Sequence, residues 1–441
     1  MTITDITSEG NGVGKADGFV IFVPDSAIGD DLQVRIVKLQ KNFAYGIIEE
    51  IVTPSSDRIL PNCSVYSKCG GCSLRHISYE AELALKENWV KQHLLRIGGL
   101  NIPILPIIGS PQQDGYRNKG QCPVRSDGGA VFVGMFSKRS HRIIPCTGCK
   151  LQPAHFEAIL KIVQNFCEKL SISIYNEEKR TGLLRHVYIR HAEATNETMV
   201  CLVINGSELP HSDILIEQLC AQCPSVKSLV LNINNATTNV ILGKTCKVLW
   251  GSERINDVLC GVKISLSPLS FYQVNHAGAE KLYNVVAEFA ELCGNEVLLD
   301  LYCGAGTIGL SLAHRIKTLI GVEITPQAVE DATANAAANG ITNAVFLCDD
   351  ATGAAQRLHA EGLTPNVVVL DPPRRGCEAE VLSAVAEMHP QRIVMVSCNS
   401  ATLARDLAVL ETYGYSTIKA QPLDMFPRTG HVECVALLCL K

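Results

Sequence analysis

The stretch that decides the fold is Val297-Leu-Leu-Asp-Leu-Tyr-Cys-Gly304-Ala-Gly-Thr-Ile-Gly-Leu310. A short apolar run leads directly into a G-x-G-x-x-G sequence, and a helical pattern follows. Glycines at such a turn let the backbone approach a ligand closely. The next apolar run ends at Glu323, within the spacing expected of an acid that binds a ribose hydroxyl. The stretch therefore predicts a ribose-containing cofactor at the carboxyl end of the first strand of an α/β sheet.

From about residue 267 onward, apolar strand patterns alternate strictly with helical patterns, which is typical of a parallel, doubly wound sheet. The predicted strands are Val297–Tyr302, Thr318–Ile324, Ala344–Cys348, Val367–Leu370 and Arg392–Val396. The tail from Gly414 to Leu440 reads as two further strands. We expect these two strands to form an antiparallel hairpin on one edge of the sheet.

The glycine loop alone does not identify the cofactor, because NAD-binding proteins use the same pattern. Asp300 stands immediately before the loop, where a carboxylate favours a sulfonium cation and disfavours a pyrophosphate. The turn Asp371-Pro372-Pro373 closes the fourth predicted strand, where methyltransferases usually place their reaction site. Both features favour S-adenosylmethionine, with NAD as the alternative.

A thiol follows the fifth predicted strand, in Arg392-Ile-Val-Met-Val-Ser-Cys398. The carboxyl end of a strand is where ligands bind in open α/β sheets. Cys398 comes one strand–helix unit after Asp371, so the two side chains are expected at the same edge of the sheet. Cys398 is therefore predicted to be a nucleophile that faces the cofactor; the alternative is a buried strand thiol.

A cysteine cluster lies between the N-terminal region and the predicted sheet. The chain has 19 cysteines, a high count for a reducing compartment, where clustered thiols indicate metal binding or catalysis. Cys63, Cys69 and Cys72 are followed far downstream by Cys146 and Cys149. The spacing alone fits a zinc site or an iron–sulfur cluster equally well. Most other cysteines stand singly in apolar stretches and are predicted to be small buried hydrophobic residues.

The regions before the predicted sheet have weaker patterns. Residues 1–53 show glycine-punctuated short apolar runs, which predict a small barrel of about five strands. Residues 79–98 have one apolar face and predict a helix. Residues 115–265 mix strand and helix patterns and predict an α+β region.

The bulk composition is that of a globular protein. The chain has 441 residues, of which 47% are hydrophobic and 19% charged, and its length predicts two to four domains. No signal peptide or membrane span is expected, so we predict a cytoplasmic protein. The formal net charge of −5 argues against coating nucleic acid by bulk charge, although a local basic groove remains compatible with it. Candidate basic stretches are Lys38 with Lys41, Tyr116-Arg117-Asn118-Lys119, Lys138-Arg139-Ser140-His141-Arg142, and Lys179-Arg180 with Arg185.

Taken together, these segments resemble the RNA uracil-5 methyltransferases of the RumA/TrmA family over nearly the whole chain. Residues 1–53 resemble the TRAM domain found at the front of RumA-like members. Further matching segments are Ser270-Phe-Tyr-Gln-Val-Asn275, Asp371-Pro-Pro-Arg-Arg-Gly376, Ser397-Cys-Asn399 and Met425-Phe-Pro-Arg-Thr-Gly-His-Val-Glu433.

The resemblance implies a multidomain fold. Residues 1–54 would form an OB-like TRAM barrel, and residues 55–266 a central α+β RNA-binding domain with an iron–sulfur site. Residues 267–441 would form an α/β Rossmann-like class I methyltransferase domain that binds S-adenosylmethionine. The helix at about 79–98 would pack on this catalytic domain, although it precedes the central one. We also expect the chain to act as a monomer.

The resemblance also implies roles for individual residues. Cys398 would be the nucleophile and Glu433 the base. Cys63, Cys69, Cys72 and Cys149 would hold a 4Fe–4S cluster. The residues implied to bind or orient the cofactor are Gln273, Tyr302, Gly304, Gly306, Thr307, Glu323, Asp350 and Asp371.

The implied reaction begins with addition of the Cys398 thiolate to carbon 6 of a flipped uridine, which makes carbon 5 reactive toward the methyl group. Glu433 then removes the carbon-5 proton. Phe271, Tyr272 and Phe426 are aromatic residues near the predicted site and are either RNA-stacking or core residues. The TRAM-like front favours 23S rRNA as substrate, with tRNA as the alternative. An iron–sulfur RNA-binding protein without activity is the non-enzymatic alternative, which the presence of Cys398 and Glu433 disfavours.

Overall fold

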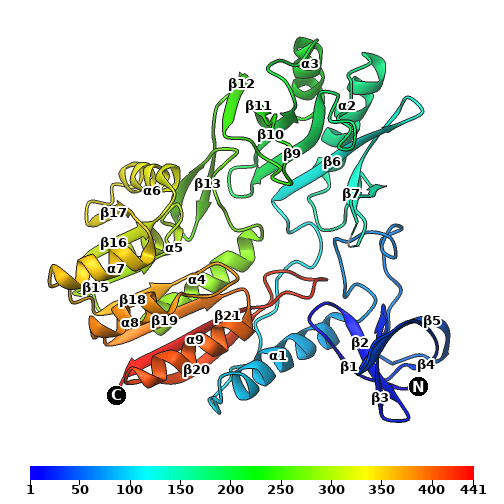
Figure 1. The fold of residues 1–441 in the computed structure, drawn as a ribbon. Helices are drawn as coiled ribbons and strands as arrows, with labels where there is room; N and C mark the ends of the chain where they lie inside the picture. The colour runs from blue at the N-terminus through cyan, green and yellow to red at the C-terminus, as the bar shows by residue number, and fades with distance from the viewer. Residues whose placement is uncertain (139) are drawn as a thin grey trace.

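The computed structural model describes residues 1–138 and 140–441, which form three larger β-sheets and a two-stranded ribbon (Figure 1). The N-terminal sheet, the central sheet and the C-terminal sheet follow one another along the chain, and helices cover the second and third. Among the described residues, no helix combines the length and the apolar composition that crossing a membrane requires.

The N-terminal sheet is a barrel, as its turn-punctuated sequence predicts. Its strands are β1 (Ile3–Ile6), β2 (Asn11–Ala16), β3 (Phe19–Pro24), β4 (Asp31–Leu39) and β5 (Phe43–Thr53). They are hydrogen-bonded in the order β1-β2-β3-β5-β4, and a bridge between Thr2 and Asp31 links the first strand to the last. Ile3, Val23 and Leu32 are buried inside.

Helix α1 (Tyr79–Arg96) leaves the barrel and joins the C-terminal part of the molecule (Figure 1). The Ser78 side chain caps its first turn by accepting a hydrogen bond from the Ala81 N–H at 3.2 Å. Trp89 donates to the Ile6 carbonyl of the barrel at 2.7 Å. Val90 and Leu94 are buried in the same core as residues of the C-terminal sheet. The helix therefore links the barrel to the C-terminal sheet.

The central sheet has the strand order β12-β11-β10-β9-β6-β7-β8. Its strands are β6 (Lys119–Asp127), β7 (Ala130–Phe136), β8 (Ile143–Pro145), β9 (Leu184–Ala192), β10 (Glu197–Ile204), β11 (Val226–Ile233) and β12 (Thr245–Gly251). Helices α2 (His155–Lys169) and α3 (Ser212–Gln222) pack against it through a shared apolar core. The predicted α+β character of this region is confirmed.

The C-terminal sheet has the order β17-β16-β15-β18-β19-β21-β20. Its parallel strands are β15 (Val297–Leu301), β16 (Thr318–Glu323), β17 (Ala344–Cys348), β18 (Val367–Leu370) and β19 (Arg392–Ser397). The last two, β20 (Tyr415–Leu423) and β21 (Glu433–Leu440), are antiparallel. The predicted parallel sheet and its edge hairpin are both confirmed.

Helices cover both faces of this sheet, because alternate strand residues point to opposite sides. On one face lie α4 (His276–Ala290), α5 (Thr307–Leu312) and α6 (Pro326–Ala338). On the other lie α7 (Ala351–Ala360), α8 (Ala379–Glu387), α9 (Ser400–Thr412) and, from far upstream, α1. This is the doubly wound arrangement that binds ligands at the carboxyl ends of its strands.

The ribbon of β13 (Ile255–Leu259) and β14 (Val262–Leu266) packs between the central and C-terminal sheets. Ile255 and Leu259 are buried in the same core as Tyr188 of the central sheet and Leu298 of the C-terminal sheet. The domain boundary that we expected at residue 266 therefore lies at the end of this ribbon, and the ribbon shares its apolar core with the regions on both sides of the boundary.

Candidate active site

The carboxyl edge of the C-terminal sheet brings together most of the predicted site residues. Along the strand order from β17 to β21, each strand delivers one side chain or loop to this edge. A cleft of about 1080 Å³ opens there. Its lining includes, in spatial order, Asp350, Glu323, Tyr302 with Gly304, Asp371, Cys398 and Glu433.

The glycine loop follows β15 and has the backbone geometry that its sequence predicts. Gly306 has a positive φ of +77°, and a Cβ atom there would lie 3.0 Å from the Phe346 ring. The Asp300 side chain accepts a hydrogen bond from the Gly309 N–H at 3.0 Å. Its other carboxyl oxygen is buried without a hydrogen-bond partner among the described residues. Burial, followed by the charge of Asp371, raises the pKa of Asp300 to about 8.

Two acids line the cleft at the carboxyl ends of β16 and β17. Glu323 ends β16 and accepts hydrogen bonds from the N–H groups of Gly304 at 3.2 Å and Thr325 at 2.9 Å. Asp350 caps α7 by accepting from the Gly353 N–H at 2.9 Å. Glu323 is half-buried at the cleft. This cradle of loop and carboxylates fits a nucleoside cofactor.

Two predicted cofactor residues lie behind the cleft wall. Gly306 and Thr307 begin helix α5, and neither lines the cleft. The Thr307 hydroxyl lies 2.7 Å from the Tyr283 hydroxyl of α4. Their role in cofactor binding therefore stays a prediction, and the structure gives Thr307 a hydrogen bond to α4.

The segment before α4 forms another wall of the cleft. Gln273 lines it, and its carbonyl accepts a hydrogen bond from the Asn118 side chain at 2.9 Å. Phe271 is 64% exposed at the rim, and Phe426 also lines the cleft. Tyr272 is only 3% exposed, and its hydroxyl donates to Asp257 at 2.9 Å, so it serves mainly as a core residue.

Cys398 and Glu433 lie beside each other at the same edge of the sheet, one at the end of β19 and the other at the start of its neighbour β21. Ser397 of β19 pairs with Cys434 of β21, so the next step of the antiparallel ladder sets Cys398 opposite Glu433. Glu433 is 5% exposed. Burial, followed by the charge of Asp371, raises the pKa of Glu433 to about 8, while Arg374 lowers it.

Arg374 is a site residue that our sequence reasoning missed. It lines the cleft directly after the Asp-Pro-Pro turn, and its guanidinium contacts His431 at 3.3 Å. Burial and the charge of Glu433 raise the pKa of Cys398 to about 11, whereas the charge and a hydrogen bond of Arg374 lower it. The signal in the sequence that could have identified Arg374 is its position as a basic residue directly after the predicted Asp-Pro-Pro turn.

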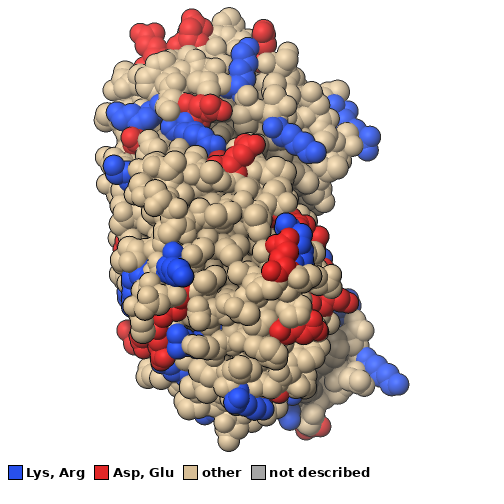
Figure 2. All heavy atoms as spheres, turned by 90° about the vertical axis from the view of Figure 1, so that its left-hand side faces the viewer, with Lys and Arg blue, Asp and Glu red and all other residues tan. Residues whose placement is uncertain are grey.

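Basic residues enter the cleft from the central sheet. Arg117 and Lys119, one of the predicted basic stretches, line the wall of the cleft. Burial and the nearby charges of Arg190 and Arg117 lower the pKa of Lys119 to about 8. On the face shown in Figure 2, acidic and basic side chains alternate between wide uncharged areas. This face therefore shows no broad basic surface, and the basic side chains of the cleft wall are a local feature.

The other predicted basic stretches have different surroundings. Lys38 and Lys41 are exposed on the barrel. Arg185 is buried and donates to the carbonyls of Asn234 and Ala236, both at 2.7 Å. Arg139 lies outside the described residues.

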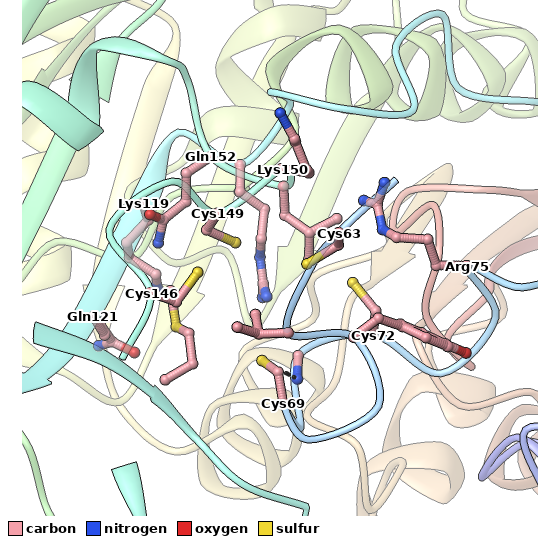
Figure 3. Close-up of a pocket in the computed structure, with 16 residues that line it drawn as sticks. Cys63, Cys69, Cys72, Arg75, Lys119, Gln121, Cys146, Cys149, Lys150 and Gln152 are labelled. Carbon is pink, nitrogen blue, oxygen red and sulfur yellow. Dashed lines mark hydrogen bonds between the residues drawn. The ribbon is translucent and has the colours of Figure 1, made fainter. Parts of the chain in front are cut away.

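The cysteine cluster surrounds a second, smaller cavity of about 160 Å³ (Figure 3). The thiols that line it are those of Cys63, Cys69, Cys72, Cys146 and Cys149. Arg75, Arg117, Lys119 and Lys150 line it too. Within residues 1–138 and 140–441, no three His, Cys, Asp or Glu side chains lie close enough together to hold a single metal ion. A four-iron cluster is larger than one ion and holds its thiolates farther apart.

The surroundings of the individual thiols differ. The Gly71 N–H donates to the Cys69 sulfur at 3.3 Å. Burial raises the pKa of Cys72, and the nearby charge of Arg75 lowers it. Burial raises the pKa of Cys149, and the N–H groups of Leu151 and Gln152 lower it. Burial also raises the pKa of Cys146 to about 12, and its other contributions come only from neighbouring thiols. Soft thiol donors, N–H groups and nearby cations fit an iron–sulfur cluster.

The comparisons with known proteins agree with this geometry. Residues 78–441 match the family of tRNA (uracil-5-)-methyltransferases, and residues 1–48 match the TRAM domain. The chain belongs to the tRNA (uracil-5-)-methyltransferase family. The resemblance to this family that the motifs indicate is thereby confirmed.

Several bacterial proteins of this family are similar over their full length. A Clostridium tetani protein described as an uncharacterized RNA methyltransferase is 43% identical, over 99% of this chain and 95% of its own. A Bacillus cereus protein with the same description is 44% identical, over 100% of this chain and 96% of its own.

A solved structure is similar in fold over the whole length. It is the Pyrococcus abyssi tRNA (uracil-54, C5)-methyltransferase in complex with S-adenosyl-L-homocysteine. It has a TM-score of 0.80 and 28% identity, and 99% of each chain is covered. The family assignment makes this protein an RNA (uracil-5-)-methyltransferase that uses S-adenosylmethionine, and it decides against NAD.

Proposed function

We propose that this enzyme methylates carbon 5 of a specific uridine in structured RNA, with Cys398 as nucleophile and Glu433 as base. The observation that carries the proposal is their placement opposite each other at the cleft, across β19 and β21. Asp371 ends the neighbouring strand β18 beside them. A thiol and a buried carboxyl at one strand edge are what a mechanism of addition and elimination needs.

Carbon 5 of uracil is a poor nucleophile, so the reaction starts at carbon 6. The Cys398 thiol loses its proton to solvent, and the thiolate forms a bond to carbon 6. The electron pair of the carbon 5–carbon 6 double bond moves toward carbon 5 and oxygen 4. Arg374 supports this step because its positive charge favours the thiolate over the thiol.

S-adenosylmethionine, when bound, supplies an electrophilic methyl group on a sulfonium. Glu323 and Asp350 would hold its ribose and adenine sides. Asp300, which precedes the glycine loop, keeps one buried carboxyl oxygen without a hydrogen-bond partner among the described residues. Gln273 and Asp371 would orient the uracil ring between the cofactor loop and Cys398. These positions align the reacting atoms before the chemical step.

Glu433 completes the reaction. Its carboxylate takes the proton from carbon 5, the double bond between carbons 5 and 6 forms again, and the carbon 6–sulfur bond breaks to release the Cys398 thiolate. Glu433 then returns its proton to solvent. Its burial next to Asp371 makes it a stronger base than an exposed carboxylate.

A uracil stacked inside RNA cannot present carbon 6 to a side chain, so the uridine must be flipped out or unpaired. Phe271 and Phe426 at the cleft offer surfaces for stacking bases. Arg117 and Lys119 offer positive charge to the RNA backbone on the opposite wall.

We also propose that Cys63, Cys69, Cys72 and Cys149 hold a 4Fe–4S cluster. Backbone N–H groups lower the pKa of the Cys149 thiol, whereas neighbouring thiols only raise that of Cys146, which supports Cys149 over Cys146 as the fourth ligand. The cluster would join the segment that carries the first three cysteines to the segment that follows β8. The reaction derived above transfers no electron, so we assign the cluster a structural or RNA-shaping role.

We propose 23S rRNA as the substrate, on the basis of the TRAM domain. tRNA is the second candidate, because the Pyrococcus abyssi enzyme is by its title a tRNA methyltransferase and matches 99% of this chain, the barrel region included. Methylation of 23S rRNA fragments and of tRNA transcripts, with the modified uridine located by mass spectrometry, separates the two.

The test of the mechanism is Glu433→Gln with RNA and methyl-labelled cofactor. Addition and methyl transfer should proceed while elimination stalls, so a methylated protein–RNA adduct should survive a denaturing gel. Cys398→Ala in the same background should remove the adduct. Normal turnover by Glu433→Gln without an adduct would overturn the assignment of the base.

A further inference from the structure

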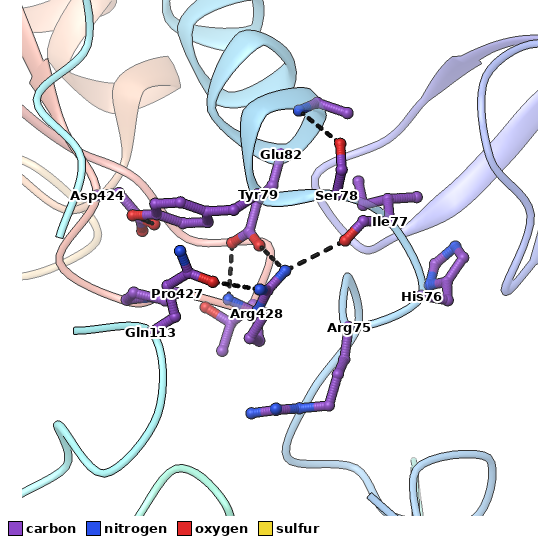
Figure 4. Close-up of polar contacts among 12 residues, drawn as sticks. Arg75, His76, Ile77, Ser78, Tyr79, Glu82, Gln113, Asp424, Pro427 and Arg428 are labelled. Carbon is purple, nitrogen blue, oxygen red and sulfur yellow. Dashed lines mark hydrogen bonds and ion pairs between the residues drawn. The ribbon is translucent and has the colours of Figure 1, made fainter. Parts of the chain in front are cut away.

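The segment Asp424–Val432 joins β20 to β21 and leads directly into the catalytic base. Its Phe426 lines the cleft, and Glu433 is the first residue of β21. On its other side the segment contacts α1 and the residues that follow the cysteine cluster (Figure 4). It therefore touches two regions that the reaction itself does not use.

Four buried charges hold this segment to α1, and we name them the α1 charge cluster: Glu82, Lys86, Asp424 and Arg428. Lys86 donates to Glu82 and to Asp424, both at 2.7 Å, and to the Phe426 carbonyl at 3.1 Å. Tyr79 donates to the other oxygen of Asp424 at 2.8 Å. The two acids and two bases balance in formal charge, as a buried cluster requires.

Within the α1 charge cluster, Arg428 contacts several separate segments of the chain (Figure 4). Its N–H donates to Glu82 at 2.7 Å, and its guanidinium donates to the Ile77 carbonyl at 3.1 Å and to the Gln113 side chain. Its own carbonyl accepts from the N–H groups of Ser73 at 3.0 Å and Leu74 at 3.1 Å. Arg428 thus binds the chain directly after Cys72.

The backbone of Arg428 is held in an uncommon conformation. Its φ is +69°, in the left-handed region that a residue with a long side chain rarely adopts. Such a conformation persists only where several contacts fix it, and it is often found at functional sites. At Gly430, two residues after Arg428, an added Cβ atom would lie 1.8 Å from the Ser8 carbonyl oxygen, so the barrel packs closely against the same segment.

We propose that Arg428 is a positioning residue that couples the cysteine-bearing segment to the catalytic base. This inference rests on the proposed role of Glu433. Ordering of the segment around Cys72 fixes Ser73 and Leu74, these fix Arg428, and Arg428 fixes the approach of the chain to Glu433. A cluster bound at the cysteines would thereby act on elimination, although it lies outside the cleft.

The coupling predicts a specific kinetic defect. A displaced Glu433 slows removal of the carbon-5 proton, while Cys398 on β19 still adds to carbon 6. The covalent adduct should then accumulate in the steady state. An unspecific loss of stability lowers the amount of active enzyme and leaves the adduct fraction of that enzyme unchanged.

Two variants test this without leaving a buried charge alone. Arg428→Lys keeps the positive charge but removes the planar guanidinium, which can donate hydrogen bonds to several acceptors at once. Arg428→Met with Glu82→Gln removes one charge of each sign, so that Lys86 and Asp424 remain balanced. The control is Arg392→Met, which removes an ion pair with Glu291 at the opposite end of β19. Each is compared with wild type for adduct fraction and for hydrogen exchange of residues 70–78, the latter also in metal-free protein.

We expect at least a 10-fold larger adduct fraction in both Arg428 variants, faster exchange at Ser73 and Leu74, and wild-type behaviour of Arg392→Met. Cys72→Ala should raise the adduct fraction in the same way. Unchanged adduct and unchanged exchange in folded Arg428 variants would overturn the coupling. If Glu433→Gln itself gives no adduct, the proposed base fails instead, and the exchange result alone then decides whether Arg428 orders the cysteine segment.

Discussion

Cys398 and Glu433 stand opposite each other because β21 runs antiparallel to β19. Parallel strands bring their carboxyl ends to the ligand-binding edge, and β19 delivers Cys398 in this way. An antiparallel neighbour brings its amino end to the same edge, so the first residue of β21 becomes the base. The edge hairpin therefore supplies a second reactive group that a purely parallel sheet would have to take from a loop.

Removal of the nucleophile should abolish methyl transfer and spare cofactor binding. Cys398→Ala should lower turnover by at least about 1,000-fold, since no other thiol lines the described cleft. Methyl incorporation and calorimetric titration with S-adenosylhomocysteine measure the two properties separately. Cys293→Ala, which removes an exposed thiol, is the control. Substantial turnover by Cys398→Ala would rule out the covalent mechanism.

The pH profile should rise toward alkaline pH. Glu433 and Cys398 both act as anions, and their pKa values are raised to about 8 and about 11 in the free protein. The kcat/KM should therefore increase through about pH 8 and beyond. Arg374→Met removes the cation that favours both anions, so the profile should move to higher pH by about one unit. Arg374→Lys keeps a positive charge, so its profile should move less than that of Arg374→Met. A profile that does not move in Arg374→Met would show that Arg374 does not stabilise the two anions.

Stability should fall as the pH rises, because burial raises the pKa of Asp300 from 3.8 to about 8. Its contribution to the free energy of unfolding is fully present below pH 3.8 and is lost as the pH rises through 8. Asp300→Asn should therefore gain stability relative to wild type between pH 5.5 and pH 8.5, by up to about 3 kcal/mol. Thermal unfolding without cofactor at both pH values measures this, and parallel melting curves would contradict it.

The cysteine cavity should bind iron through Cys149 rather than Cys146. The N–H groups of Leu151 and Gln152 lower the pKa of Cys149 against the effect of burial, whereas neighbouring thiols and burial only raise that of Cys146. Anaerobic reconstitution should load wild type and Cys146→Ala with about four irons per chain, and Cys149→Ala with clearly less. Iron and sulfide analysis with visible absorption checks the outcome. The reverse pattern would move the fourth ligand to Cys146.

Phe271 should contribute to RNA binding through stacking. It is 64% exposed at the rim of the cleft, so little packing is lost when its ring is removed. Phe271→Ala should weaken RNA binding by about 1–3 kcal/mol without changing the melting temperature. Tyr413→Ala, at an exposed aromatic residue that does not line the cleft, is the matched control for filter binding. Equal affinities of the two variants would assign Phe271 no stacking role.

The strands of the C-terminal sheet were predictable because a strand buried on both faces is a nearly continuous apolar run. The same apolar runs made two acids of the site predictable, because each acid stands where a run ends. Glu323 is the last residue of β16, and Asp371 directly follows β18. Local sequence was sufficient there because strand, turn and ligand edge lie within a few residues of one another.

Other features depend on contacts between distant segments. No local pattern sets Cys398 against Glu433, because that requires the register of β19 and β21. The role of Arg374 depends on its proximity to both. Likewise, the sequence of α1 taken alone indicates an ordinary amphipathic helix, and contacts with distant residues, such as that of Lys86 with Asp424, show which part of the molecule it packs on.

The Lys86–Asp424 contact also bears on how the chain is made, because it spans 338 residues. At a synthesis rate of about 5–20 residues per second, α1 waits on the order of tens of seconds for its partner strand. During that interval Glu82 and Lys86 are free to remain in water while the barrel and the central sheet fold. Closure of the catalytic half is then a late step in biogenesis, and the N-terminal third of the chain must stay accessible until the last strands emerge from the ribosome.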